Sequence, residues 1–199
     1  LAPGIHTGNS KTASGGFAEL VPAHTSMAIA CPDDVPDEVA VLADPFSVAL
    51  HSVLRNPPPI GGRVLVYGIG ALGLSTLAVL AKLYPTVEVG AIVRWQHQAD
   101  AAERHAALPF FHSPPESLVE AVADWSQAKL HKPWEGLPMT FPGGVDVVYD
   151  TVAAPETLEV SVRVLRARGR MVLTGVSQAG RFEWSPWYFK ELNLIGSNA

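Results

Sequence analysis

A run of six residues that contains three glycines, Gly68-Ile69-Gly70-Ala71-Leu72-Gly73, constrains the fold of this chain more than any other feature. It follows an apolar run at residues 64–67 and leads into a stretch without proline that reaches residue 83. This order predicts a strand, a tight turn and a helix. A second apolar run at residues 87–93 supplies the returning strand of a βαβ unit.

Each glycine of this pattern has its own task in a βαβ unit that binds a nucleotide. The first permits the turn, the second lets a pyrophosphate approach the backbone, and the third lets helix and strand pack closely. The first amides of the helix and the positive end of its dipole then face the phosphates. We therefore predict a dinucleotide site, with a purely structural turn as the alternative. The predicted contacts are Gly68, Gly70, Ala71, Leu72 and Gly73.

The composition favours a protein that acts on small molecules. The chain has 199 residues, of which 48% are hydrophobic, and this suits one compact domain or one domain with part of another. Its net charge of -5 comes from scattered acidic and basic residues, which argues against nucleic acid and membrane surfaces as partners. The single cysteine, Cys31, excludes an internal disulfide and a zinc site built from several cysteines, and it suits a reducing compartment such as the cytoplasm. No stretch approaches the roughly 20 apolar residues of a membrane-spanning helix.

Strand-like and helix-like segments alternate along most of the chain. Strands are expected at residues 15–21, 27–30, 64–67, 87–93, 108–111, 145–149, 170–173 and 192–195. Helices are expected after Pro36 and at residues 44–54, 72–83, 98–107, 116–125 and 156–165, the second of these with a buried face of Phe46, Leu50, Val53 and Leu54. Residues 1–14 are predicted to be loop, and residues 129–144 show no assignable pattern. The alternation predicts an α/β fold with a doubly wound parallel sheet, the Rossmann dinucleotide-binding domain.

The residue at the end of the second strand bears on the choice of dinucleotide. Glu88 is 20 residues after Gly68, close to the spacing of a ribose-binding acid, but it stands at the beginning of the strand. Ligands of open α/β sheets bind beyond the carboxyl ends of the strands, where this chain has Arg94. An arginine offers a planar fork of donors to a ribose 2′-phosphate, so the sequence favours NADP(H) over NAD(H). A solvated surface arginine is the alternative.

Four segments together resemble the medium-chain, zinc-containing alcohol dehydrogenase superfamily, in particular its polyol and threonine dehydrogenase branches. Residues 15–22 are similar to the strand that closes the catalytic domain of that family. Residues 42–52, which contain Asp44-Pro45-Phe46-Ser47, are similar to the segment that leads into its cofactor domain. The glycine run, and Asp150-Thr151-Val152 followed by Thr174-Gly175-Val176, resemble the strand ends of that domain.

The resemblance implies a division of the chain. Residues 1–44 would be the C-terminal remnant of a β-rich, GroES-like catalytic domain, residues 45–195 the dinucleotide-binding domain, and residues 196–199 the start of the return to the catalytic domain. The first two zinc ligands of the family precede the position of Gly15, and nothing in residues 1–14 matches them. We therefore expect a chain cut at both ends, with zinc only in the intact enzyme and no turnover by this part alone.

The resemblance also suggests roles for individual residues. Asp44 lies where the family has its third zinc ligand or a residue bonded to the zinc water, although Asp before Pro is also a helix N-cap. His51 is a candidate for the proton path or the cofactor's surroundings, with a packed or surface role as the alternative. The residues expected to line the nicotinamide half of the site are Thr151, Val152, Thr174, Gly175 and Val176, ordinary strand-end turns being the alternative. Aromatic residues at 182–189 near the last strand suggest a homodimer that forms through that strand.

The function implied is hydride transfer between an alcohol and a nicotinamide cofactor, with this chain as the cofactor-binding part. The substrate would be a small alcohol or carbonyl compound. A zinc-independent quinone or enone reductase of the same superfamily is one alternative. A nucleotide-binding module without chemistry is the other.

Overall fold

A computed structural model describes residues 15–198 of the chain, so the predicted loop at residues 1–14 lies outside the described part, as does Ala199. The chain separates into two units, Leu1–Leu42 and Ala43–Ala199. We describe each unit by itself. Among the helices of residues 15–198, none is both long enough and apolar enough to span a bilayer.

The described part of the first unit is mostly irregular. It holds a short 3₁₀ helix, η1 (Thr25–Met27), and one helical turn, α1 (Asp37–Ala40), which follows Pro36 as predicted. The strands expected at residues 15–21 and 27–30 are wrong, because residues 15–42 contain no strand. Phe17 and Ile29, the apolar side chains that suggested them, are almost fully exposed. A strand needs a neighbouring strand to satisfy its backbone hydrogen bonds, and these segments have none within the described residues.

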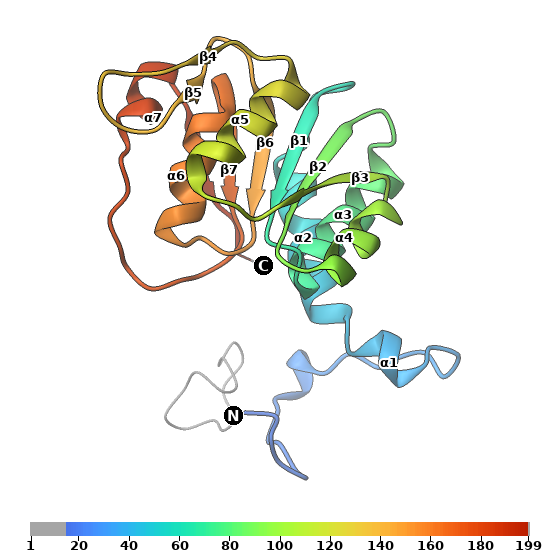
Figure 1. Ribbon diagram of the computed structural model, residues 1–199. Coiled ribbons are helices and arrows are strands. Elements are labelled where there is room, and N and C mark those ends of the chain that lie inside the picture. The colour runs from blue at the N-terminus through green and yellow to red at the C-terminus, as the bar shows by residue number, and fades with distance from the viewer. Residues whose placement is uncertain (1–14, 199) are drawn as a thin grey trace. The chain divides into compact units, whose positions relative to one another are not determined.

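The second unit is a six-stranded parallel sheet covered by helices on both faces, in the strand order β3-β2-β1-β6-β7-β8 (Figure 1). The strands are β1 (Arg63–Tyr67), β2 (Glu88–Val93), β3 (Ala107–Phe111), β6 (Val145–Asp150), β7 (Leu165–Leu173) and β8 (Asn193–Gly196). The helices are α2 (Ala43–Arg55), α3 (Ala71–Leu83), α4 (Gln96–Glu103), α5 (Pro115–Ser126), α6 (Pro155–Val164) and α7 (Ser185–Lys190). The predicted doubly wound α/β fold is confirmed.

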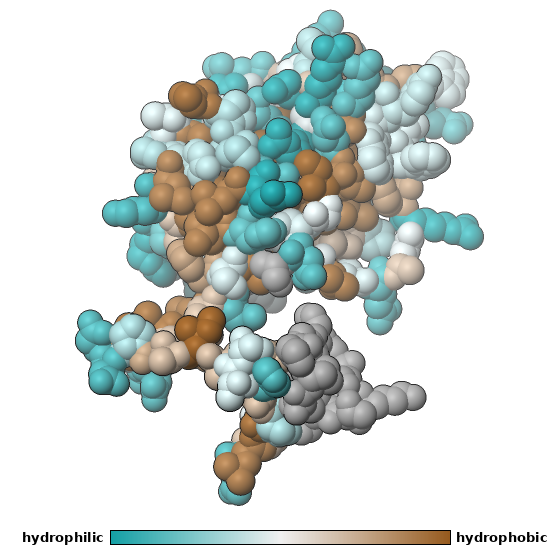
Figure 2. Space-filling model, turned by 180° about the vertical axis from the view of Figure 1, so that it is seen from behind, coloured by the Kyte–Doolittle hydropathy of each residue, from teal (hydrophilic) through white to brown (hydrophobic). Residues whose placement is uncertain are grey.

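The central strand shows why both faces are covered. Val64 and Val66 of β1 belong to the core cluster formed with α2, α3 and α4, whereas Leu65 and Tyr67 belong to the cluster formed with α5 and α6. Successive side chains of a strand point to opposite faces, so an unbroken apolar run requires an apolar layer on each side. Apolar surface still remains outside these layers, interspersed with polar surface (Figure 2).

The buried face of α2 differs from the predicted one. Ala49, Ser52 and Val53 are buried, while Phe46 and Leu54 are 43% and 53% exposed. The stripe that packs against α3 is centred on Ala49 and Val53, and a small residue at its centre lets the two helices approach. Val53 and the partly buried Leu50 pack against the core as predicted, whereas Phe46 and Leu54 flank this stripe, so only half of the predicted face is correct.

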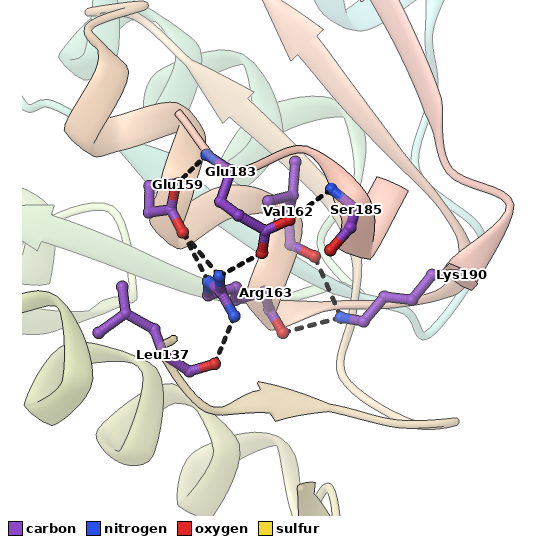
Figure 3. A network of polar contacts seen from close by, with 7 residues as sticks. All are labelled: Leu137, Glu159, Val162, Arg163, Glu183, Ser185 and Lys190. Carbon is purple, nitrogen blue, oxygen red and sulfur yellow. Dashed lines mark hydrogen bonds and ion pairs between the residues drawn. The ribbon is translucent and has the colours of Figure 1, made fainter. Parts of the chain in front are cut away.

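Two segments without a clear sequence pattern are ordered by hydrogen bonds. Residues 129–144 form a two-stranded antiparallel ribbon of β4 (Leu130–His131) and β5 (Met139–Thr140). The aromatic segment before β8 contains α7, whose buried Lys190 donates from Nζ to the backbone oxygens of Val162 and Arg163 at 3.1 and 2.8 Å (Figure 3). It also donates to the backbone oxygen of Leu165 at 2.6 Å. Burial, and then the charge of Arg163, lowers the pKa of Lys190 to about 7.

Arg163, a residue of α6, links this helix to the segment between β4 and β5 and to the segment before α7. Its guanidinium pairs with Glu159 and Glu183, each at 2.8 Å, and also donates to the backbone oxygen of Leu137 (Figure 3). Lys190 and Arg163 together fasten α7 and the ribbon to the end of α6. This anchorage fixes the path of the chain into β8.

Candidate functional site

A cleft of about 420 Å³ opens at the carboxyl ends of β1, β2 and β6. It lies where the strand order reverses between β1 and β6, which is the usual position of a ligand in an open α/β sheet. The lining residues are Tyr67, Gly68, Ile69, Gly70, Ala71, Leu72, Ile92, Arg94, Gln98, His112, Thr151, Val152 and Thr157. The cleft therefore brings the glycine run together with the predicted residues Arg94, Thr151 and Val152.

The three glycines of the run have different surroundings. Gly68 has φ +87°, and a Cβ there would lie 2.4 Å from Val152 Cγ2. A Cβ on Gly73 would lie 2.0 Å from the backbone oxygen of Gly68, so this position permits the close approach of α3 to the turn. A Cβ on Gly70, by contrast, would meet nothing within 4 Å. The fold itself requires the first and third glycines, and the second faces open space in the cleft.

The start of α3 is suited to an anion. Gly70 is the N-cap, and it provides no side chain to bond the first amides of the helix. The backbone N–H groups at a helix start have no acceptor within the helix, and the helix dipole adds a partial positive charge. A phosphate beside Gly70 and Ala71 would meet both effects.

Thr151 holds the glycine turn against the end of β6. Its hydroxyl lies 2.9 Å from the backbone oxygen of Tyr67 and 2.7 Å from that of Gly68, and its amide donates to the Tyr67 oxygen at 3.0 Å. The side chain expected to line the nicotinamide half thus also positions the turn.

Asp150 organises the connection from β6 to α6. Its fully buried carboxylate accepts hydrogen bonds from the amides of Val152 and Ala153, at 2.9 and 2.8 Å, and from the hydroxyl of Thr157 at 2.6 Å. Burial raises the pKa of Asp150, and these hydrogen bonds oppose the rise. These three hydrogen bonds hold the turn between β6 and α6, so Asp150 has a structural role in the cleft wall.

Arg94 and Glu88 lie at opposite ends of β2. Arg94 follows the carboxyl end and lines the cleft, and Gln98 Oε1 accepts from its amide at 2.8 Å and from that of Trp95 at 3.2 Å. Glu88 begins the strand and pairs with Arg63 at 2.9 Å. Glu88 is therefore directed away from a ligand in the cleft.

Other predicted residues lie outside this cleft. Thr174 and Gly175 donate from their amides to the backbone oxygen of Asp150 at 2.9 and 3.1 Å, and Val176 is 96% exposed. His51 is an exposed residue of α2 that borders a separate hollow of about 170 Å³ with Arg55 and the end of β8. Asp44 is exposed in the first turn of α2, one residue inside the helix start at Ala43.

Residues 15–198 do not provide a metal centre. No three side chains of the His, Cys, Asp or Glu types converge among them. Asp44 therefore belongs to no such group in this part of the chain.

Sequence reasoning missed six lining residues: Tyr67, Ile69, Ile92, Gln98, His112 and Thr157. Tyr67 directly precedes the first glycine and His112 directly follows β3, so their places at strand ends were signals that could have found them. His112 Nε2 lies 3.4 Å from Glu156 Oε1 at the start of α6, and both side chains are partly exposed. No motif marks Gln98 or Thr157, because they are helix residues five and seven positions beyond the ends of β2 and β6.

The sheet order, the switch-point cleft and the glycine turn define a nucleotide-binding domain of the Rossmann type. A model of the family described as zinc-binding dehydrogenase matches residues 68–199. The chain belongs to this family.

Named relatives agree with this family. L-threonine 3-dehydrogenase of Rhizobium rhizogenes is 30% identical over 183 residues, which are 92% of this chain and 48% of that protein. D-arabinitol dehydrogenase 1 of Uromyces fabae is 28% identical over 191 residues, which are 94% of this chain and 51% of that protein. The chain thus spans about half the length of the curated relatives that it matches.

Solved structures show the same fold. The structure described as a short chain alcohol dehydrogenase from E. coli CFT073, complexed with cofactor NADH, has a TM-score of 0.74 and 25% identity, covering 93% of this chain and 50% of that one. The 2R,3R-butanediol dehydrogenase of Bacillus subtilis has a TM-score of 0.72 and 21% identity, covering 94% of this chain and 49% of that one.

Proposed function

We propose that the cleft binds a nicotinamide dinucleotide and that the whole protein transfers hydride between a small alcohol and that cofactor. The observation that carries this proposal is the glycine turn, in which Gly68 and Gly73 are required by packing while Gly70 leaves open space beside the start of α3. A pyrophosphate needs such a space. When bound, the cofactor would supply the hydride chemistry, and the residues of this chain would bind and orient it.

The named relatives favour alcohol oxidation over the two alternatives, a zinc-independent quinone or enone reductase and a module without chemistry. Threonine 3-dehydrogenase and arabinitol dehydrogenase are both named for hydroxylated substrates. For the whole protein we further propose catalytic zinc, with Asp44 as a ligand or as a partner of the zinc water and His51 near the proton path. Thr174, Gly175 and Val176 remain our candidates for the nicotinamide end.

We propose NADP(H) as the preferred cofactor because Arg94 lines the cleft after β2. Among the described residues no carboxylate forms an ion pair with its guanidinium, so its donors are available to a 2′-phosphate. A charge-assisted hydrogen bond contributes about 1.5–3 kcal/mol, so loss of the guanidinium should weaken NADPH binding by roughly 10- to 150-fold.

The test is a titration of the chain with NADPH and NADH, followed by nicotinamide fluorescence. Arg94→Gln should weaken NADPH binding and leave NADH binding nearly unchanged. Arg104→Gln is the matched control, because Arg104 is an exposed arginine at the end of α4 and does not line the cleft. If NADH bound the unaltered chain at least as tightly as NADPH, the proposed preference would be wrong.

A homodimer through β8 is our proposal for the assembly. β8 is an edge strand that pairs with β7, and Trp184, Tyr188 and Phe189 nearby are 68%, 79% and 65% exposed. An edge strand beside apolar side chains offers both backbone hydrogen bonds and apolar area to a second copy. Light scattering after size exclusion should give twice the mass of the chain, and a monomeric mass at high concentration would contradict the proposal.

A further inference from the structure

One buried polar atom at the cleft has no hydrogen-bond partner. Within residues 15–198, two buried side-chain oxygens lack a partner, Tyr67 Oη and Ser161 Oγ, and of these two residues only Tyr67 is among those that line the cleft. Tyr67 is the last residue of β1 and is 4% exposed. A buried hydroxyl without a partner is costly, and such atoms in native proteins call for a specific explanation.

The surroundings of this hydroxyl limit what it can bind. Burial raises the pKa of Tyr67 well above its ordinary value, the charges of Glu156 and Asp150 raise it further, and the charge of Arg94 opposes the rise, so the phenol stays neutral. It can both donate and accept a hydrogen bond. Two carboxylates and one guanidinium act on the hydroxyl, so the net charge around it is negative and disfavours an anion there, whereas the start of α3 is suited to one. The group that Tyr67 meets should therefore be an uncharged part of the ligand.

The purine base, the ribose hydroxyls and the nicotinamide carboxamide are the uncharged groups of a dinucleotide that both donate and accept hydrogen bonds. Tyr67 shares the cleft with Arg94 and Gln98 at the end of β2, where we place the adenosine half, and this favours the purine. We propose that Tyr67 Oη hydrogen-bonds the polar edge of the purine, so that Tyr67 is a positioning residue for the adenosine half of the cofactor. This inference rests on the proposed function. The hydroxyl is closed to water, so neighbouring side chains must shift to admit the base. The partly exposed His112–Glu156 pair, held at 3.4 Å, is suited to do so.

The proposal predicts opposite effects of Tyr67→Phe on stability and on binding. Removing a hydroxyl that has no partner should leave the melting temperature unchanged or higher. Removing the hydrogen bond to the base should weaken binding of NADP⁺ and of NAD⁺ by about 2- to 10-fold. NAD⁺ lacks the 2′-phosphate that Arg94 is proposed to bind, so an equal loss of affinity for NAD⁺ and NADP⁺ cannot come from a change at Arg94.

A modified ligand locates the bond on the base. In 1,N⁶-etheno-NADP⁺ the added ring blocks the polar edge of the purine, so Tyr67→Phe should change its affinity little. The combination of protein variant and ligand change forms a double-mutant cycle, which separates the hydrogen bond from the bulk of the added ring. Isothermal titration calorimetry of the 199-residue chain gives all four dissociation constants.

Tyr149→Phe is the matched control. The hydroxyl of Tyr149 is also buried, but it donates to the backbone oxygen of Asn56 at 2.6 Å in the opposite core cluster. This variant should lower the melting temperature and leave cofactor affinity unchanged.

Three results would overturn the inference. The first is that Tyr67→Phe loses as much affinity for 1,N⁶-etheno-NADP⁺ as for NADP⁺. The second is that it loses affinity for neither of these two ligands. The third is a fall in the melting temperature of Tyr67→Phe as large as that of Tyr149→Phe. The proposed function fails separately, and the inference with it, if the unaltered chain binds neither NADP⁺ nor NAD⁺.

Discussion

Substitution of Asp150 by alanine tests how the cleft wall is held. The carboxylate accepts from two backbone amides and one hydroxyl, and it is fully buried. In Asp150→Ala the amides of Val152 and Ala153 lose their acceptor, while the Thr157 hydroxyl keeps a second acceptor, the backbone oxygen of Ala154 at 2.9 Å.

The magnitude follows from the two orphaned amides. Each unsatisfied buried donor costs about 1–3 kcal/mol, and relief of the buried charge offsets part of the sum, so we expect a net loss of about 2–4 kcal/mol. For a chain of this size that corresponds to a fall in melting temperature of roughly 5–15 °C. Asp150→Asn keeps an oxygen for both amides and should lose less than about 1 kcal/mol.

The assay is thermal and urea unfolding of both variants, with cofactor titration of each. Val152 packs against Gly68, so Asp150→Ala should also weaken dinucleotide binding. An alanine variant as stable as the asparagine variant would show that the two amide hydrogen bonds do not hold this turn.

Acid adds a second readout for the same residue. Burial raises the folded-state pKa of Asp150 above its ordinary value of 3.8, so the ionised carboxylate costs stability at neutral pH. As the pH falls through the folded-state pKa towards 3.8, the folded protein takes up the proton first and this cost disappears. The stability of the unaltered chain relative to Asp150→Asn should therefore rise over that interval, and a fall would mean that the pKa is lowered.

Three further changes test other parts of the account. Thr151→Val removes a hydroxyl that bonds the oxygens of Tyr67 and Gly68, so it should cost about 1 kcal/mol in urea unfolding and weaken dinucleotide binding; unchanged binding would show that the turn needs no such support. Glu88→Gln should change the free energy of unfolding by less than about 1 kcal/mol and leave cofactor affinity unchanged, because Glu88 pairs with Arg63 at the end of β2 away from the cleft. A loss of affinity would mean that the cofactor contacts that end of β2. Gly73→Ala places a Cβ 2.0 Å from the Gly68 oxygen, so circular dichroism should report a clear fall in melting temperature, and a variant as stable as the unaltered chain would contradict the packing role of Gly73.

The sequence predicted the central elements well because two signals agreed there. Apolar runs such as β1 and β6 indicate strands buried on both faces, and the glycine run fixed the turn between β1 and α3. The strand direction predicted that Arg94 and not Glu88 stands at the carboxyl end of β2, and in the structure Arg94 lines the cleft while Glu88 pairs with Arg63; its part in binding stays a prediction.

The failures lay where local pattern does not determine structure. Residues 15–21 alternate as a strand does, yet a strand forms only with a neighbour to share its hydrogen bonds. The face of α2 was only half correct, with Val53 and Leu50 packed as predicted, because Ala49 and Ser52 are buried without being strongly apolar. His112 and Gln98 reach the cleft through the sheet order and helix placement, neither of which a short motif encodes.

Gly70→Ala is the most direct test of the central claim that the glycine turn binds a dinucleotide. The added Cβ meets nothing within 4 Å, so the variant should fold and melt like the unaltered chain. The same Cβ would occupy the space that a pyrophosphate needs, so calorimetric affinity for NADP⁺ and NAD⁺ should fall by more than roughly tenfold. A Gly70→Ala chain that binds both cofactors as tightly as the unaltered chain would contradict the account.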